Sequence, residues 1–130
     1  MPKAPPKSVV VSQYMQRKPV TVTADMNIYD ASQRILENKI SGVLVVDKDH
    51  RLVGMLSEVD CLRALVTSVY NGSDPGGALV GDVMTADVEV NGPSDDIISV
   101  AASMLDKHHR RRPVVEDGKL IGQVTCRQIL

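Results

Sequence analysis

One short segment combines a hydroxyl, free backbone amides and a carboxylate: Gly54-Met55-Leu56-Ser57-Glu58-Val59-Asp60. We expect a strand to end there and a helix to begin, with Ser57 as its N-cap and Asp60 in its first turn. A helix N-terminus favours an anion such as phosphate, and a carboxylate suits the paired hydroxyls of a ribose. The same Ser-x-x-acid pattern is typical of a capping box without a ligand, which is the favoured interpretation of the local pattern alone.

A second candidate cluster is basic and reads His108-His109-Arg110-Arg111-Arg112-Pro113. The planar fork of arginine suits phosphate oxygens, so Arg110 and Arg111 are candidate anion ligands. The alternative is a solvated basic turn. We favour that alternative for Arg112, whereas for Arg110 and Arg111 the two interpretations have equal weight.

The elements that must position these residues occur twice, because the chain is an internal repeat with an offset of 68 to 69 residues. Val43 to Asp47 lies over Arg112 to Glu116, and Arg51 to Ser57 lies over Lys119 to Thr125. Earlier matched positions are Met15 with Met84, Val20-Thr21-Val22 with Val88-Glu89-Val90, and Ile28, Ala31 and Ile35 with Ile97, Val100 and Met104.

Each copy predicts the order strand, helix, strand, strand, helix. In the first copy Asn27 is the expected N-cap of a helix with Ile28, Ala31 and Ile35 on its apolar face. Val43 to Val46 is a β-branched run typical of a buried strand, and the helix after Ser57 carries Val59, Leu62, Val66 and Val69 on one face. The expected fold is therefore α/β, with two repeats packed around an approximate two-fold axis and a cleft between them.

The repeat with Gly-hydrophobic-x-Ser/Thr-x-x-Asp at the third-strand-to-helix junction resembles a pair of CBS domains, a Bateman module. That resemblance implies a regulatory module that binds an adenine nucleotide, AMP or ADP, in the cleft. It places the ribose contact on Asp60 and the phosphate-side hydroxyl on Ser57. The second copy keeps the hydroxyl at Thr125 but has Gln128 in place of the acid, so we expect a weak or empty second site.

The resemblance also implies that Arg110 and Arg111 reach across the cleft to phosphates held beside Ser57 and Asp60. Val20, Val43 and Leu44 are candidates for an apolar wall around the adenine, although plain core packing is the stronger interpretation for each of them alone. The resemblance implies a homodimer as well. Candidate contact surfaces are two apolar helix faces, Leu62, Val66 and Val69 on one and Ile97, Val100 and Met104 on the other.

Composition narrows the function classes. The 130 residues carry a net charge of −1 and only 2% aromatic side chains, which argues against a nucleic-acid binder. No apolar run approaches the roughly 20 residues that span a bilayer, and no signal peptide is evident, so a soluble cytoplasmic protein is expected. The chain has no nucleophile-elbow, Walker or zinc-protease motif, and Cys61 and Cys126 form no CxxC. We therefore expect neither an enzyme nor a metal site.

The expected organisation is a disordered tail over residues 1–8, one repeat over 9–70, a linker over 71–77 and a second repeat over 78–130. Because the chain stops at Leu130, the last helix is short, as in a trimmed chain. The rival hypothesis is a ligand-free interaction scaffold in which Ser57 and Asp60 only cap a helix. The residues do not indicate which protein receives the signal.

Overall fold

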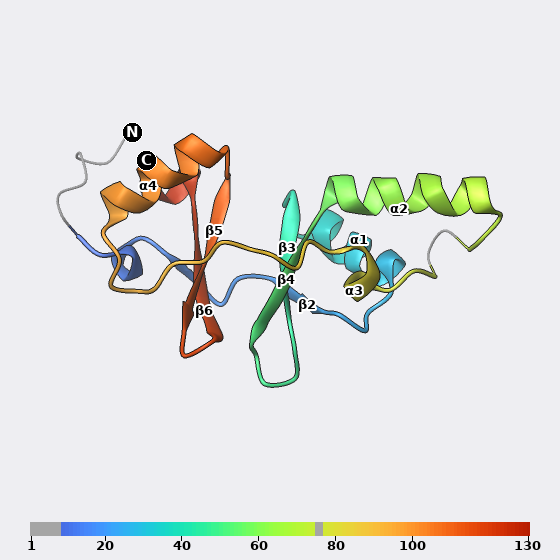
Figure 1. The fold of residues 1–130 in the computed structure, drawn as a ribbon, viewed down its shortest axis with the longest axis horizontal. Coiled ribbons are helices and arrows are strands. Elements are labelled where there is room, and N and C mark those ends of the chain that lie inside the picture. Colours follow the sequence, from blue (N-terminus) through green and yellow to red (C-terminus); the bar gives the residue numbers. More distant parts are fainter. Residues whose placement is uncertain (1–8, 75–76) are drawn as a thin grey trace. The chain divides into compact units, whose positions relative to one another are not determined.

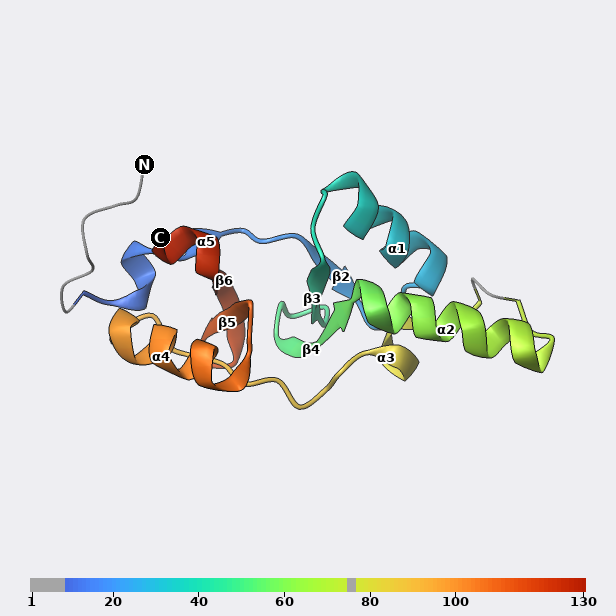
Figure 2. The ribbon, with the colours of Figure 1, turned by 90° about the horizontal axis from the view of Figure 1, so that it is seen from above.

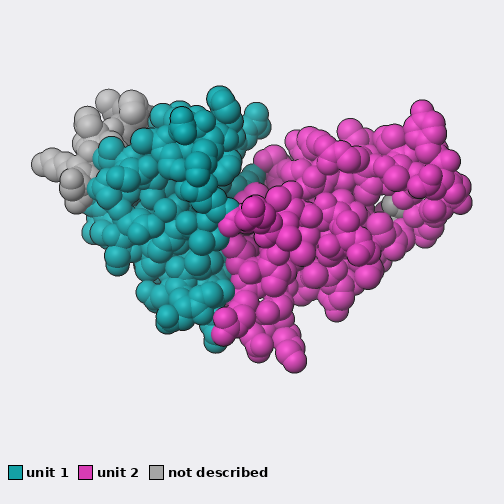
Figure 3. Space-filling view, in the orientation of Figure 1, with its two compact units in different colours: residues 1–19, 89–130 teal, residues 20–88 magenta. Residues whose placement is uncertain are grey.

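The computed structural model describes residues 9–74 and 77–130, which form two compact units (Figure 3). Unit 2 is the continuous segment Val20–Val88, and unit 1 combines residues 9–19 with Glu89–Leu130. The sequence repeats are therefore not the packing units, because 9–19 belongs with the second repeat and 78–88 with the first. The predicted tail lies outside the described residues, as do positions 75 and 76 of the predicted linker.

Unit 2 is a three-stranded sheet with helices packed on it. Its strand order is β2-β3-β4, with a parallel β2–β3 pair and an antiparallel β3–β4 pair. Figures 1 and 2 show α1 and α2 on the same side of this sheet. The elements are β2 (Thr21–Thr23), α1 (Ile28–Glu37), β3 (Gly42–Val46), β4 (Leu52–Ser57), α2 (Glu58–Asn71) and α3 (Val80–Val83).

The two long helices of unit 2 begin where the sequence predicts. The Asn27 side chain accepts the Asp30 N–H at 2.8 Å, which satisfies a free amide at the start of α1. Ser57 caps α2 in the same way, and α2 ends at Gly72 with a left-handed φ of 68°. The core of unit 2 forms between α1 and the sheet from Ile28, Ala31, Ile35, Val22, Val43, Val45 and Leu56, with Val80 of α3.

Unit 1 has a related plan with a different third strand. Its strand order is β1-β6-β5, with both pairs antiparallel, and α4 and α5 lie on one side of β5 and β6 (Figures 1 and 2). Its elements are a short 3-10 helix (Val11–Gln13), β1 (Gln16–Arg17), α4 (Ile97–Lys107), β5 (Arg111–Glu116), β6 (Lys119–Thr125) and α5 (Cys126–Ile129).

The apolar face of α4 points into unit 1. Ile97, Val100 and Met104 are at most 2% exposed and pack in one cluster with Val114 and Val124. The prediction that these three α4 residues form a contact surface is therefore wrong, because the sheet of their own unit covers them.

The predicted strand over Val88 to Val90 is also wrong. In the described segment before α4, Asn91 alone pairs with β5, in a single parallel bridge to Val114. The Asn91 N–H donates to the Pro113 carbonyl at 3.0 Å, and the Val115 N–H donates to the Asn91 carbonyl at 2.9 Å. The next bond of a parallel ladder would run from the N–H of residue 113 to the Glu89 carbonyl. Proline has no N–H, so the ladder stops there.

A close backbone contact explains the glycine of the first motif. Met55 and Thr85 exchange two backbone hydrogen bonds of 2.9 Å, which brings residue 85 against β4. A Cβ on Gly54 would lie 2.9 Å from the Thr85 carbonyl oxygen. Gly122 has the matching role on β6, where a Cβ would lie 2.8 Å from the Gln16 carbonyl oxygen.

Candidate ligand site at the strand-to-helix junctions

The junction between β4 and α2 is a complete capping box. The Asp60 N–H donates to Ser57 Oγ at 3.1 Å, and the Ser57 N–H donates to Asp60 Oδ2 at 2.9 Å. Both side chains thus bond to the backbone of the other residue. The helix-capping role that the sequence indicated for Ser57 and Asp60 is therefore present, and it fixes the Asp60 carboxylate at the start of α2.

The second oxygen of Asp60 has a looser partner. Arg63 Nη1 donates to Asp60 Oδ1 at 3.3 Å, and the Arg63 side chain is 69% exposed, whereas that of Asp60 is 14% exposed. An exposed ion pair of this kind contributes about 0–1 kcal/mol, so Arg63 is easily displaced. Asp60 therefore offers one carboxylate oxygen committed to the backbone and one that a ligand hydroxyl can reach at small cost.

The strand residues near this junction divide between the two faces of the sheet. Gly42 pairs with Ser57 and Leu44 with Met55, and side chains alternate along a strand, so Leu44 and Ser57 share one face. Val43 faces the opposite side and belongs to the core of unit 2, which is plain packing. Val20 is half-buried and packs against the same core. Leu44 is thus the wall candidate on the face that carries Ser57.

The equivalent junction in unit 1 has the same geometry without the charge. The Thr125 N–H donates to Gln128 Oε1 at 3.0 Å, and the Gln128 N–H donates to Thr125 Oγ1 at 3.4 Å. Gln128 therefore replaces the acid in the capping box but supplies an amide where unit 2 has a carboxylate. A ribose diol at this position would lose a charged acceptor.

Arg110 and Arg111 lie at the start of β5, next to this uncharged junction. The Cys126 N–H donates to the Arg110 carbonyl at 3.2 Å, and Arg111 pairs directly with Thr125 across the hairpin. Arg110 is exposed and Arg111 half-buried. Burial, followed by repulsion from the Arg110 charge, lowers the pKa of Arg111. Both causes disfavour the guanidinium cation, and a nearby anion would offset them.

Comparison with known protein families finds the same repeat that the two junctions show. The profile of the CBS domain matches the chain twice, over residues 11–67 and 80–130. The chain is a tandem CBS-domain protein. It is 32% identical over 146 residues to the uncharacterized protein MJ1426 of Methanocaldococcus jannaschii, covering 90% of this chain and 87% of that one.

Two further relatives set the scale of the similarity. The uncharacterized protein MJ1225 of the same organism is 28% identical over 115 residues, which cover 88% of this chain but only 39% of the relative. The crystal structure of CBSX2 in complex with AMP superposes with a TM-score of 0.83 at 31% identity, covering 93% of each chain. The fold of the CBS pair is therefore shown over nearly the whole chain.

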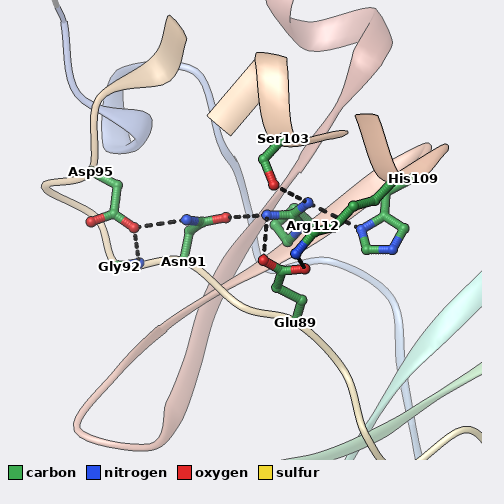
Figure 4. A network of polar contacts seen from close by, with 8 residues as sticks. Glu89, Asn91, Gly92, Asp95, Ser103, His109 and Arg112 are labelled. Atoms are coloured by element: carbon green, nitrogen blue, oxygen red, sulfur yellow. Dashed lines mark hydrogen bonds and ion pairs between the residues drawn. The ribbon is translucent and has the colours of Figure 1, made fainter. Parts of the chain in front are cut away.

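The second CBS repeat contains a charged cluster that the sequence did not indicate. The prediction of a solvated Arg112 is wrong, because this side chain is only 1% exposed. Its Nη1 donates to Asn91 Oδ1 at 2.9 Å, and its Nη2 donates to Ser103 Oγ at 3.2 Å (Figure 4). Arg112 points inward because it faces Val124 across the hairpin, on the core side of the sheet.

Three further side chains complete this cluster. Arg112 Nη2 lies 3.0 Å from His109 Nδ1, which must accept because a guanidinium only donates. Glu89 Oε1 lies 3.8 Å from Arg112 Nη1, and Lys107 Nζ forms an ion pair with Glu89 Oε2 (Figure 4 shows Glu89 below Arg112). The hydrogen bond from Lys107 is the largest cause that lowers the pKa of Glu89.

Apolar side chains gather outside the junctions, along α2 of the first CBS repeat. Leu62, Val66 and Val69 are 60%, 46% and 64% exposed, so this candidate dimer surface is accessible in the chain described. A groove of ≈ 320 Å³ runs between α1 and α2, and Tyr29, Leu36, Cys61, Leu62 and Leu65 are among its lining residues. In the described part of the chain, no helix is both long and apolar enough to cross a bilayer.

Proposed function

We propose that the chain is a cytoplasmic regulatory module, not an enzyme, that binds an adenine nucleotide, AMP or ADP, at the junction formed by Ser57 and Asp60. The observation that carries the proposal is the Asp60 carboxylate, 14% exposed, with one oxygen fixed to the backbone and the other paired, among the described residues, with the exposed Arg63. Membership in the CBS family and the similarity to CBSX2, which was solved with AMP, support this choice.

Each residue has a distinct role in this proposal. The free Asp60 oxygen accepts hydrogen bonds from the ribose hydroxyls, displacing Arg63. The Ser57 hydroxyl is the phosphate donor at the start of α2, where the helix dipole favours negative charge. The Glu58 N–H donates to the Ser41 carbonyl and the Asp60 N–H to Ser57 Oγ, so these two amides are not assigned to the ligand. Leu44, on the face of the sheet that carries Ser57, contributes an apolar wall for the adenine, whereas Val20 packs against the core of unit 2.

Arg110 and Arg111 supply the phosphate contacts. Burial, and then repulsion from Arg110, lower the pKa of Arg111, and a phosphate near the guanidinium would favour its charged form. At the second junction, Thr125 has no carboxylate beside it, because Gln128 occupies the acid position. We therefore assign the strong site to Asp60 and a weak one to Thr125.

The chain itself suggests the test. Asp60→Gln reproduces the capping box that Gln128 forms in the second repeat, so the fold should be kept while the carboxylate is lost. Calorimetric titration with AMP should show a loss of about 1–3 kcal/mol in binding free energy, as expected for a missing charged acceptor. The reciprocal variant Gln128→Asp should strengthen binding at the second site. Equal AMP affinity in the wild type and the Asp60→Gln variant would contradict the assignment.

The exposed apolar face of α2 favours a second function, assembly. Leu62, Val66 and Val69 lie on one side of a helix that has no buried residue within the chain described. Exposed patches of this kind mark interaction surfaces, and we propose a homodimer that forms through α2. If no adenine nucleotide raises the melting temperature while the dimer persists, the chain is a scaffold rather than a sensor.

A further inference from the structure

The buried charge of Arg112 is the most unusual feature of the second repeat. A charged side chain that is 1% exposed requires partners, and this one has them on three different segments. Asn91 and Glu89 precede α4, Ser103 lies within α4, and His109 follows it. Arg112 therefore joins the segment before α4 and the turn after it to the first residues of β5.

This side chain compensates for backbone pairing that the second repeat lacks. In unit 2, β2 pairs with β3 over three residues, Thr21 to Thr23. In unit 1 the corresponding segment keeps only the Asn91–Val114 bridge, because Pro113 cannot donate the next hydrogen bond. The guanidinium of Arg112 bonds to the Asn91 side chain beside that bridge, so a side chain provides what a ladder provides elsewhere.

The same contacts hold both ends of the turn that carries Arg110 and Arg111. His109 precedes these two arginines and Arg112 follows them, and the two are joined by the 3.0 Å contact between Nη2 and Nδ1. A side-chain contact thus joins the residues on either side of Arg110 and Arg111, the candidate phosphate ligands. Arg112 Nε has no hydrogen-bond partner among the described residues, so the whole connection is made through the two Nη groups.

We infer that Arg112 is a positioning residue: by linking Asn91, Ser103 and His109 it fixes the backbone from which Arg110 and Arg111 extend toward the ligand phosphate. The inference rests on the proposed function for its ligand, but the link itself is independent of any ligand. Arg112 does not touch the nucleotide in this scheme. It sets the selectivity for a phosphorylated over an unphosphorylated adenosine ligand.

Amide hydrogen exchange tests the link without a ligand. Arg112→Met keeps an unbranched apolar chain and removes the guanidinium. We expect the amides of Asn91 and Val115, which form the single bridge, to exchange about 10-fold faster in this variant. The amides of Met55 and Thr85, which form a separate bridge in unit 2, should be unchanged. Arg34→Met is the control variant, since Arg34 donates to the Thr21 carbonyl at 2.9 Å from an exposed position.

Titration with AMP and with adenosine then tests whether the link affects phosphate recognition. In the Arg112→Met variant we expect AMP affinity to fall about 10-fold while adenosine affinity stays within about 2-fold, because adenosine has no phosphate for the arginines. Arg34→Met should change neither affinity. Unchanged AMP affinity, or an equal loss for AMP and adenosine, would overturn the positioning role.

Failure of the proposed nucleotide binding can be told apart from failure of the Arg112 link. If the wild type binds neither AMP nor adenosine, the proposed function fails, and the exchange experiment alone decides the link. Unchanged exchange at Asn91 and Val115 overturns the link whatever the ligand result. Should Arg112→Met not fold, Asn91→Ala removes the side-chain acceptor at 2.9 Å and keeps the arginine, and faster exchange of the Val115 amide again supports the link.

Discussion

Arg112 occupies in one sheet the register position that Val43 occupies in the other. Arg112 faces Val124 across the β5–β6 hairpin, and Val43 faces Leu56 across the β3–β4 hairpin. Both side chains are almost completely buried, yet one is apolar and the other charged. The two repeats therefore share a backbone plan but stabilise the start of the central strand by different chemistry.

The capping box of α2 should contribute to stability independently of any ligand. Asp60→Ala removes the acceptor of the Ser57 N–H and should reduce the free energy of unfolding by about 1 kcal/mol. Asp60→Gln should cost much less, because a glutamine forms the same box in the second repeat. Urea unfolding of the three proteins measures the difference. Equal losses in both variants would show that the box is not the source.

The stability of unit 1 should fall in acid. Hydrogen bonds, from Lys107 to Glu89 and from Asn91 to Asp95, are the largest causes that lower the pKa of these two carboxyl groups in the folded chain. A carboxyl with a lowered folded pKa stabilises the fold above its unfolded pKa, and that contribution is lost as the pH falls through the folded value.

The loss should therefore begin below about pH 4.3, the usual glutamate value, and continue through lower pH. Urea unfolding between pH 3 and pH 7 measures it. The double variant Glu89→Gln, Asp95→Asn should show a weaker acid dependence than the wild type. If the unfolding free energy of the wild type and of the double variant falls equally with pH, these two carboxyl groups do not contribute to the acid dependence.

Gly54 should not tolerate a side chain. In Gly54→Ala the new Cβ would meet the Thr85 carbonyl oxygen at 2.9 Å and Met84 Sδ at 2.5 Å, so the paired segment must move. We expect a loss of about 1–3 kcal/mol in unfolding free energy. Gly92→Ala is the control, because its nearest neighbour, Asp95 Oδ1, is 3.9 Å away. Thermal or urea unfolding of both variants compares them directly.

Cys61 should react slowly with alkylating agents. Burial is the main cause that raises the pKa of this thiol, which lies in the groove between α1 and α2. Because the thiolate is the nucleophile, iodoacetamide at neutral pH should modify the exposed Cys126 first. Mass spectrometry of a time course resolves the two sites. Faster labelling of Cys61 would show that the groove opens in solution.

Charge on the apolar face of α2 should separate the proposed dimer. The double variant Leu62→Glu, Val66→Glu places two carboxylates on side chains that are 60% and 46% exposed, so the monomer fold should survive. Sedimentation velocity should show a dimer for the wild type and a monomer for the variant. Thr67→Glu is the control, because Thr67 is exposed but does not belong to the face of Leu62, Val66 and Val69. This variant should remain dimeric.

The repeated plan follows directly from the sequence, and the exceptions have local physical causes. The caps at Asn27 and Ser57 were predictable because short-range hydrogen bonds determine them. The missing strand before α4 depends on one N–H that Pro113 lacks, at a position that only the tertiary register reveals. Every residue from Val43 to Val46 is apolar. The sequence therefore shows no alternation of polar and apolar residues from which to predict that Val43 faces the core of unit 2 and Leu44 the other side of the sheet.

Arg112 and the face of α4 were mispredicted for a related reason. The partners of Arg112 lie 3 to 23 residues away along the chain, and three consecutive arginines are typical of a solvated turn. The stripe of Ile97, Val100 and Met104 has the period of an amphipathic helix, but that period indicates only that one face is covered. Whether the cover is the chain's own sheet or a second copy depends on packing that the pattern does not encode.

Unit 1 is assembled from both ends of the described chain, whereas unit 2 is continuous, and this difference gives the chain an order of folding during synthesis. All residues of unit 2 are synthesised before β5 and β6. The segment from Val11 to Arg17 must therefore wait, its apolar side chains unpaired, until the last strands emerge to receive it. A stall in translation after unit 2 has emerged but before β6 is complete would leave unit 2 folded and the segment from Val11 to Arg17 without its partner strand.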